Sequence, residues 1–334
     1  MLAQYAGATD PGRRRRRNED AYVCEPPLFA IADGMGGAQA GEVASRLAAA
    51  VLEEAKGGEG AEVGGEERVA SLIREANSRV YRRSNEDATT SGMGTTMTVA
   101  LVEPGGRTIA FGHVGDSRAY RLRGGELEQL TDDHSLVGEL VRSGRLSPEE
   151  AESHPQRAVI TRALGTEPDV DVDTFTVEAE PDDVYLLCSD GLTDMVSVGE
   201  IHALVEESDD LEAAARALVD AANAGGGEDN VTVVLFRIGG GEAGETQRLP
   251  AAALPEPEPE PEQDDEDTLS PLDRVPAVDT AVIPVEAVHE ELRKADADEQ
   301  RRRDDEGGRR IVPLLVFALL VLALLALALW GVSR

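Results

Sequence analysis

The sequence has few cysteines and lacks several patterns that mark large classes of proteins. Among 334 residues, the only cysteines are Cys24 and Cys188, so we expect neither a disulfide framework nor a cysteine-based zinc site. No GxGxxG or Walker motif is present, which argues against a nucleotide-binding parallel sheet. The first residues, MLAQYAGATD, lack the charged start and apolar core of a secretory signal. We therefore expect the N-terminal part to stay in the cytoplasm.

The chain is also poor in positive charge. It contains 32 Lys and Arg residues against 65 Asp and Glu residues, which gives a formal net charge of -33. Such a protein repels phosphate backbones, so nucleic acid is not expected as a general partner. The acidic excess is compatible with binding of divalent cations, although a solvated acidic surface is the more ordinary explanation.

Residues 1 to about 238 show the periodic patterns of a globular region. Apolar residues at helical spacing predict helices over 38–55, 66–84, 133–144, 147–153, 198–205 and 211–223. Alternating or β-branched runs predict strands over 28–33, 94–102, 107–115, 174–177 and 231–238, with two more within 117–130. Residues 184–191 repeat the pattern of the first strand, an apolar run that ends on an acid followed by glycine. We expect residues 7–20 to form a loop and the strands between 94 and 130 to form a β-meander. Blocks of strands with segregated helices predict an α+β layered fold.

The composition changes at Gly239. Residues 254–267 alternate Pro and Glu and then become acidic, which predicts a stiff, self-repelling spacer within a disordered linker over 239–310. Residues 311–330 follow with no charge, long enough to cross about 30 Å of hydrocarbon. A buried core helix is the alternative, but this run is apolar on all sides. Because five arginines precede it and only Arg334 follows, we expect a single-pass anchor in the cell membrane with the folded domain in the cytoplasm.

Acidic residues lie at the ends of several predicted strands: Glu19, Asp20, Asp33, Asp116, Asp190 and Asp229. Asp-Gly is also an ordinary turn dipeptide, so one such position alone is weak evidence. Acids gathered at one edge of a sheet repel each other unless they share a cation. Oxygen ligands without histidine or cysteine favour Mg²⁺ or Mn²⁺ over zinc. Two such ions about 3.5–4 Å apart would bridge a water, lower its pKa and direct it at a phosphoryl group.

Two features adjoin these acids. The carbonyl of Gly34 can join a coordination sphere, because glycine allows the backbone to come close to an ion. The run from Arg13 to Arg17 supplies planar guanidinium groups for a phosphate dianion. A solvated or nucleic-acid-binding patch is the alternative for the arginine run.

The motifs resemble, in order, those of the metal-dependent (type 2C, PPM) serine/threonine protein phosphatases, and the bacterial branch is the closer match. They are Arg15-x-x-Asn18-Glu19-Asp20, Ala32-Asp33-Gly34-Met35-Gly36-Gly37, Gly94-Thr95-Thr96, Gly115-Asp116-Ser117-Arg118, Asp133-His134-Ser135, Ile160-Thr161-Arg162-Ala163-Leu164-Gly165, Ser189-Asp190-Gly191 and Asp229-Asn230-Val231-Thr232. Each motif is weak alone, but the ordered series is specific and covers residues 4–238. The resemblance implies a four-layer α-β-β-α sandwich of two antiparallel sheets flanked by helices.

The resemblance also implies roles for individual residues. Asp33, Asp190 and Asp229 would hold a first metal ion. Glu19, Asp33 and the Gly34 carbonyl would hold a second, and Asp116 with Asp190 a third, weaker one. Asp33 would bridge the first two ions, Asp20 would contact bound water, and Arg15 would bind the phosphate. The expected cofactors are Mn²⁺ or Mg²⁺.

One position departs from the pattern of animal members. Where many of those have a histidine proposed as general acid, this chain has Met35, as many bacterial members do, and methionine cannot donate a proton. Metal-bound water would then protonate the leaving oxygen. His134 is interpreted as a structural or capping residue and His113 as a core residue. Residues 136–165 fall where the family has a flap beside the active site.

The leading hypothesis is a membrane-anchored protein phosphatase that hydrolyses phosphoserine and phosphothreonine by metal-activated water. Its expected partners are phosphorylated proteins, such as membrane serine/threonine kinases and their substrates. A catalytically inactive phosphoprotein-binding scaffold is the alternative, although every expected carboxylate is present. A phosphatase acting on small molecules is a third hypothesis.

Overall fold

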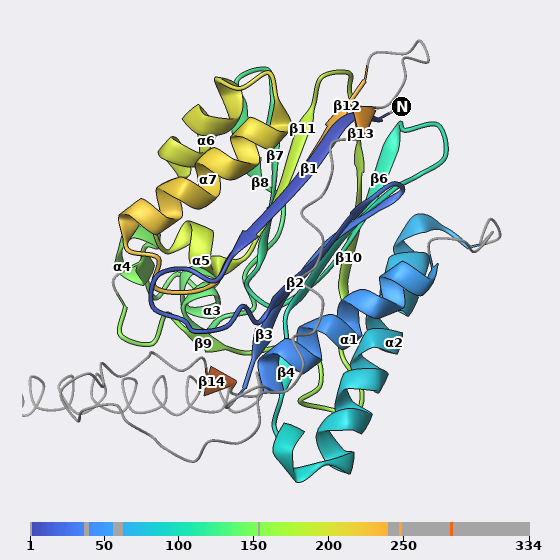
Figure 1. Cartoon of the computed structure of the whole chain (residues 1–334), viewed down its shortest axis with the longest axis vertical. Helices are drawn as coiled ribbons and strands as arrows, with labels where there is room; N and C mark the ends of the chain where they lie inside the picture. The colour runs from blue at the N-terminus through green and yellow to red at the C-terminus, as the bar shows by residue number, and fades with distance from the viewer. Residues whose placement is uncertain are drawn as a thin grey trace, which may run out of the picture. The chain divides into compact units, whose positions relative to one another are not determined.

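Two β-sheets lie face to face at the centre of the folded region, and helices cover the outer side of each sheet (Figure 1). The structure is a computed structural model that describes residues 2–36, 40–55, 63–152, 154–239, 247–248 and 281–282. All of these residues belong to the first of two units of the chain, Met1–Ile283. The expected α+β fold of two sheets with flanking helices is confirmed.

The first sheet follows the strand order β13-β1-β12-β11-β7-β8. Its strands are β1 (Leu2–Asp10), β7 (Arg118–Arg123), β8 (Glu126–Gln129), β11 (Val184–Cys188), β12 (Val231–Ile238) and β13 (Gln247–Arg248). Neighbouring strands run antiparallel, except that β13 is parallel to β1.

The second sheet follows the order β10-β6-β5-β3-β2, and β4 pairs with β3. Its strands are β2 (Asp20–Glu25), β3 (Leu28–Met35), β4 (Gly94–Thr95), β5 (Met97–Val102), β6 (Thr108–Val114) and β10 (Asp173–Glu178), all antiparallel. A separate pair joins β9 (Val159–Ile160) to β14 (Ala281–Val282) in parallel.

Helices cover the two sheets separately. Apolar side chains of α1 (Ala40–Ala55) and α2 (Gly65–Glu86) pack on the second sheet. Those of α5 (Asp190–Thr193), α6 (Val198–Glu206) and α7 (Leu211–Gly225) pack on the first. The short helices η1 (Ala88–Thr90), α3 (Leu136–Arg142) and α4 (Pro148–Glu152) lie in connections between strands.

A core rich in aromatic rings holds the two sheets together. Phe29 of β3 stacks on Phe236 of β12 with ring centroids 4.3 Å apart, and Tyr185 of β11 stacks on Phe236 at 5.1 Å. Burying a side chain of this size stabilises a fold by about 1.5–3 kcal/mol relative to leaving it exposed. The Phe29–Phe236 contact bridges the two sheets, while Tyr185 packs beside Phe236 within the first sheet, and together they fix the space at the end of the sandwich, where the acids lie.

The N-terminal region differs from the sequence-based expectation. Residues 7–10 belong to β1 rather than to a loop, and β2 was not expected. β1 contains small residues, including Gly7, whose backbone approaches the Tyr22 ring so closely that an added Cβ would lie 2.7 Å from it. Small residues have a low intrinsic preference for β-strands, so β1 forms because β12 pairs with it along its length.

The predicted β-meander is wrong. β5 and β6 do pair, but β7 crosses to the other sheet, where it lies between β11 and β8. The crossing begins at Gly115, which has a φ of +114°, a backbone conformation that favours glycine. Because β6 and β7 belong to different sheets, Asp116 lies at the end of the sandwich, between them.

The predicted helices over 66–84, 198–205 and 211–223 are confirmed as α2, α6 and α7, and that over 38–55 from residue 40 onward as α1. Within the stretch expected to be a disordered linker, β13 and β14 pair with β1 and β9. The predicted membrane span over 311–330 lies outside the described residues. No helix in the described part of the chain is long and apolar enough to cross a membrane.

Candidate active site

Strand periodicity brings two of the acids into the space between the sheets. Phe29 and Ile31 of β3 face the inter-sheet core, and because side chains alternate along a strand, Asp33 lies on the same face. Asp20 follows the same rule in β2, where Tyr22 faces that core. The two acids are also direct partners in the β2–β3 ladder.

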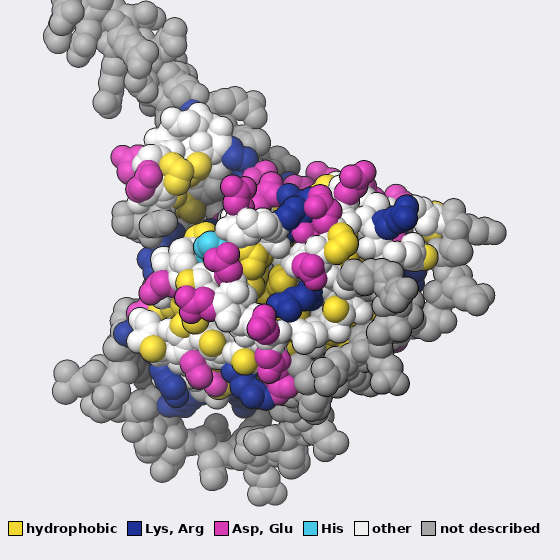
Figure 2. Space-filling model, turned by 90° about the horizontal axis from the view of Figure 1, so that it is seen from above, with side chains coloured by type: hydrophobic (Ala, Val, Ile, Leu, Met, Phe, Trp, Pro, Cys, Tyr) yellow, Lys and Arg dark blue, Asp and Glu magenta, His cyan; other side chains and the backbone are white. Residues whose placement is uncertain are grey.

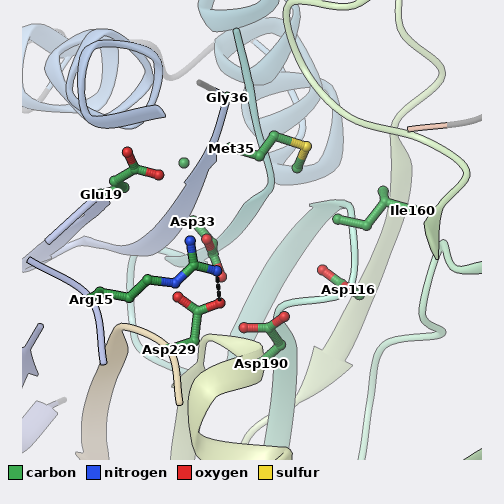
Figure 3. A pocket seen from close by; sticks show the side chains of 10 residues that line it. Arg15, Glu19, Asp33, Met35, Gly36, Asp116, Ile160, Asp190 and Asp229 are labelled. Carbon is green, nitrogen blue, oxygen red and sulfur yellow. Dashed lines mark hydrogen bonds and ion pairs between the residues drawn. The ribbon is translucent and has the colours of Figure 1, made fainter. Parts of the chain in front are cut away.

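A pocket opens at this end of the sandwich (Figure 3). Its lining residues are Arg15, Glu19, Asp33, Gly34, Met35, Gly36, Asp116, Ile160, Asp190 and Asp229. Every residue predicted from the sequence to act at the site lines this pocket, except Asp20. The residues come from loops and strand ends far apart in the chain, and the fold brings them together.

Asp20 lies behind the pocket wall and is 8% exposed. Its Oδ2 atom accepts hydrogen bonds from Ser189 Oγ at 3.0 Å and from Thr232 Oγ1 at 2.6 Å. Its Oδ1 atom is buried and has no partner among the described residues. One carboxylate oxygen is therefore fixed by two hydroxyl groups, while the other is buried without such a donor.

Two threonines hold the backbone of Asp33. Its N–H donates to Thr96 Oγ1 at 3.0 Å, and its carbonyl accepts from Thr95 Oγ1 at 2.8 Å and from the Thr96 N–H at 2.9 Å. Both threonines come from the motif Gly94-Thr95-Thr96. These bonds fix the direction in which the Asp33 side chain leaves the strand.

Glycine is required at two positions beside Glu19. A Cβ added to Gly34 would lie 2.2 Å from the carbonyl oxygen of Gly41 and 2.5 Å from that of Glu19. A Cβ on Gly41, near the start of α1, would lie 2.6 Å from Glu19 Oε2. Contacts this short exclude any side chain, so the close packing of α1 against this turn holds Glu19 and Gly34 together.

The carboxyl groups of the pocket have raised pKa values. Burial raises the pKa of Glu19 to about 7, that of Asp20 to about 6 and that of Asp116 to about 7. The pKa values of Asp33 and Asp190 are raised well above the ordinary value. Burial is the largest cause in each case, and repulsion from neighbouring carboxylates adds to it. A bound cation removes that repulsion.

The donor set fits a hard divalent cation. All of the donors are oxygen atoms, and Asp190 Oδ1, like Asp20 Oδ1, is buried without a hydrogen-bond partner in the described region. In the described part of the chain, no three acidic, histidine or cysteine side chains lie close enough to hold an ion as they stand. Asp229, another acid of the pocket, is paired as it stands with Arg15 at 2.7 Å.

Arg15 is the cationic side chain that lines the pocket. Its Nη2 atom donates to Asp229 Oδ2, the contact drawn as a dashed line in Figure 3. The guanidinium is 28% exposed, so it is within reach of a ligand that enters the pocket. Of the five arginines in the run, this is the one that the motif spacing predicts to bind phosphate.

One wall of the pocket is apolar. Met35 and Ile160 line it and form a small buried cluster with Ala163. Ile160 was not singled out by sequence reasoning, although it begins the motif Ile160-Thr161-Arg162-Ala163-Leu164-Gly165. Met35 lies at the pocket, as the motif indicates, and supplies no proton.

Neither His113 nor His134 lines the pocket. His134 Nδ1 accepts the Gly115 N–H at 3.0 Å, and its Nε2 contacts Asp173 at 3.1 Å. His113 is buried in β6, and burial lowers its pKa to about 3, so it is neutral. His134 therefore supports the turn that precedes Asp116, in agreement with a structural role.

Two antiparallel sheets between layers of helices, with an acidic pocket and an arginine at one end, define the class of metal-dependent phosphatases. A family model described as protein phosphatase 2C matches residues 13–228. The chain belongs to this family, and the enzyme class and cofactors predicted from the sequence agree with it.

Individual relatives support the same assignment. Serine/threonine protein phosphatase PstP of Mycobacterium tuberculosis is 42% identical over 256 residues, which cover 76% of this chain and 48% of that protein. Serine/threonine phosphatase stp of Listeria welshimeri is 43% identical over 235 residues, covering 68% of this chain and 92% of that protein. The chain thus spans about half the length of the first relative and most of the second.

Solved structures share the fold. The catalytic domain of serine/threonine protein phosphatase PstP in complex with two manganese ions superposes with a TM-score of 0.65 at 38% identity, covering 72% of this chain and 99% of that one. The mycobacterial PstP/Ppp structure at 1.95 Å gives a TM-score of 0.68 at 40% identity, covering 72% of this chain and all of that one.

Proposed function

We propose that this chain is a protein phosphatase that hydrolyses phosphoserine and phosphothreonine in proteins. The observation that supports this most strongly is the pocket itself, where four aspartates and one glutamate line a space that Arg15 also enters. The names of relatives in the family, serine/threonine protein phosphatases, point to the same substrate class.

Residues of the pocket would hold the metal ions that the family requires. We assign Asp33, Asp190 and Asp229 to one Mn²⁺ or Mg²⁺ ion, and Glu19, Asp33 and the Gly34 carbonyl to a second, with Asp33 shared. Asp116 and Asp190 would hold a third. When bound, such ions lower the pKa of a water molecule and neutralise phosphoryl oxygens.

Side chains of the pocket would bind the phosphoryl group and position water. Arg15 exchanges its contact with Asp229 for the phosphoryl group, whose oxygens match the donors of a guanidinium. Asp20 is fixed through its Oδ2 atom by Ser189 and Thr232, and its Oδ1 atom would accept a hydrogen bond from water bound in the site. Met35 and Ile160 form an apolar wall, which limits the access of bulk water to the reacting group.

A metal-dependent phosphopeptide assay on the full chain tests this function. We expect release of phosphate from a phosphothreonine peptide with Mn²⁺, loss of turnover with a chelator, and loss of turnover in Asp33→Ala. Full activity of Asp33→Ala would contradict the proposal. Binding of the peptide without any turnover would instead support the inactive scaffold.

We also propose that residues 311–330 anchor the enzyme in the cell membrane, next to membrane serine/threonine kinases and their substrates. The support is the charge-free run itself and the arginines on its N-terminal side. Deleting residues 311–334 is expected to leave peptide hydrolysis unchanged while phosphorylation of membrane proteins rises in cells. Unchanged phosphorylation of membrane proteins would count against the anchor.

A further inference from the structure

Four exposed arginines surround the one that enters the pocket. The run continues on both sides of Arg15, and the side chains of Arg13, Arg14, Arg16 and Arg17 remain on the surface. We call these four residues the arginine rim. One guanidinium is enough to hold the scissile phosphate, so the rim has no role in the function proposed above.

The rim occupies a fixed position beside the pocket. Asn230 Nδ2 donates to the carbonyls of Pro11 at 3.0 Å and of Arg17 at 2.9 Å, and so fastens both ends of the loop. The backbone N–H of Arg13 donates to the Gly227 carbonyl at 2.7 Å. The loop is thus tied to the segment that carries Asp229, one of the pocket acids.

The charges of the rim are only partly balanced by the protein. Arg14 contacts Glu228 at 3.3 Å and Arg17 contacts Glu42 at 3.9 Å, both in exposed pairs of the kind that contribute little. Neither Arg13 nor Arg16 has an ion pair within the described part of the chain. Adjacent like charges repel each other, so this surplus of positive charge favours an anion supplied from outside.

The rim stands out against an acidic protein. The chain has a formal net charge of -33, and acidic side chains are spread over the face shown in Figure 2, with arginines in smaller separate groups. An acidic phosphoprotein approaching such a surface is repelled except where positive charge gathers. The rim concentrates positive charge at the pocket where substrate must enter.

We propose that the arginine rim binds a second anionic group of the substrate, so that the enzyme prefers segments carrying another phosphoryl group or acidic residues near the scissile phosphate. This inference rests on the proposed function. Arg13 and Arg16 lie within two residues of Arg15, at most about 7 Å of chain. A second phosphate one to three residues from the first therefore reaches the rim.

The surroundings of the rim favour a short anionic segment over a long polyanion. Glu42 and Glu228 border it through their contacts with Arg17 and Arg14. A nucleic acid lying across the rim would also place phosphates over these carboxylates, which repel them.

The test compares two double variants of the full, Mn²⁺-loaded chain. R13Q/R16Q removes two charges of the rim. The control R107Q/R216Q removes two exposed charges elsewhere: Arg107 precedes β6 at the end away from Asp116, and Arg216 lies within α7. The substrates are p-nitrophenyl phosphate, a singly phosphorylated peptide with neutral flanks, and the same peptide with a second phosphate two residues away.

Wild type and control are expected to prefer the doubly phosphorylated peptide. R13Q/R16Q should raise its KM about fivefold, because exposed charge pairs contribute modestly. The kcat for this peptide and the turnover of p-nitrophenyl phosphate should be unchanged. The difference in KM between wild type and R13Q/R16Q should shrink at high salt. An unchanged ratio of kcat/KM between the two peptides would overturn the proposal.

A binding measurement separates the rim from the chemistry. Anisotropy of a fluorescent peptide carrying two phosphonates reports binding without hydrolysis, so it tests the rim even if the chain turns over no substrate. We expect R13Q/R16Q to weaken this binding about fivefold. Equal binding by wild type and variant, or a loss of affinity only for single-stranded RNA, would show that the rim does not select phosphoproteins.

Discussion

Two acids at opposite ends of β11 differ in almost every respect. Asp183 precedes the strand and is 1% exposed, yet its carboxylate accepts hydrogen bonds from Arg123, the Glu180 N–H and Tyr185. Burial alone would raise its pKa, but pairing with Arg123 lowers it overall. Asp190 follows the strand, its Oδ1 atom has no partner in the described region, and its pKa is raised.

This difference distinguishes an acid that belongs to the fold from one that belongs to a site. A buried carboxylate that receives donors from its own protein stabilises the structure, whereas one surrounded by other carboxylates is destabilising until a cation arrives. Raised pKa values also set Asp33, Asp116 and Asp190 of the pocket, and Asp20 behind its wall, apart from Asp183.

The largest effect is expected when asparagine replaces each of these two acids. Asp190→Asn should reduce turnover by more than the roughly 100-fold typical of losing a group that only supports a metal ligand. It should leave the metal-free protein at least as stable as before, because it removes a carboxylate that burial and neighbouring acids disfavour. Asp183→Asn should lower the free energy of unfolding by about 2 kcal/mol, since it weakens hydrogen bonds to a charged partner, and should spare kcat.

Urea denaturation and phosphate release, measured on both variants, check this prediction. The two substitutions are chemically identical, so each serves as the control for the other. Equal losses of stability would show that the two acids do not differ in the way proposed.

A smaller effect is expected from pH. In the metal-free protein, the raised pKa values of Asp20, Glu19 and Asp116 mean that the folded state binds protons more tightly than the unfolded state, whose carboxyl pKa values are about 4. This contribution to stability is complete at low pH and is lost as the pH rises to about 7. The thermal midpoint should fall by about 5 °C between pH 5 and pH 8.

Saturating Mn²⁺ should remove most of that fall, because the ions take the place of the protons. Asp183 does not contribute to this fall in the thermal midpoint. Its pKa is lowered, so its contribution to folding stability is lost only toward low pH. Scanning calorimetry with and without Mn²⁺ measures both curves. If the thermal midpoint fell equally with pH in both cases, the pocket acids would not be the groups that bind Mn²⁺.

Replacing Arg15 by lysine should have an intermediate effect. Lysine keeps the charge but not the planar pair of donors, so KM for a phosphopeptide should rise about tenfold. Stability should change little, since the contact with Asp229 is partly exposed. Steady-state kinetics check this, with Arg46→Lys as the control, because Arg46 is paired with Glu42 on α1. The comparison separates loss of the guanidinium–phosphate contact from a general effect of replacing an arginine by lysine. Unchanged KM would exclude Arg15 as the phosphate-binding arginine.

The smallest effect is expected at the apolar wall. Ile160→Ala should raise KM for phosphopeptides about threefold, because less apolar surface faces the substrate. Turnover of p-nitrophenyl phosphate should be affected less. Kinetics on both substrates check this, and a loss of turnover as large as that of Asp190→Asn would show that Ile160 supports the pocket rather than the substrate.

The pocket could be predicted from the sequence because its acids follow recognisable strands. The run 28–33 ends at Asp33, and alternation along β3 then places the side chain between the sheets. The helix starting at Asp190 was not expected, because four residues are too short for a periodic pattern. The motif nevertheless identified this acid.

The features that were missed depend on contacts between distant parts of the chain. β1 forms because β12 pairs with it, and β7 joins β11 although β6 is nearer in sequence. The donors that hold Asp20, from Ser189 and Thr232, lie far along the chain. Local patterns predict an element, but its partner depends on the packing of the whole fold.

Calorimetric titration of Mn²⁺ into the metal-free chain tests the central claim most directly. At pH 7 the wild type and Asp183→Asn are expected to bind two ions, the number present in the structure of the PstP catalytic domain, and to release protons from the pocket carboxyls. Asp33→Asn, which removes the shared ligand, should lose this binding. Tight binding of two ions by Asp33→Asn, with the same proton release, would contradict the assignment of the pocket acids as metal ligands.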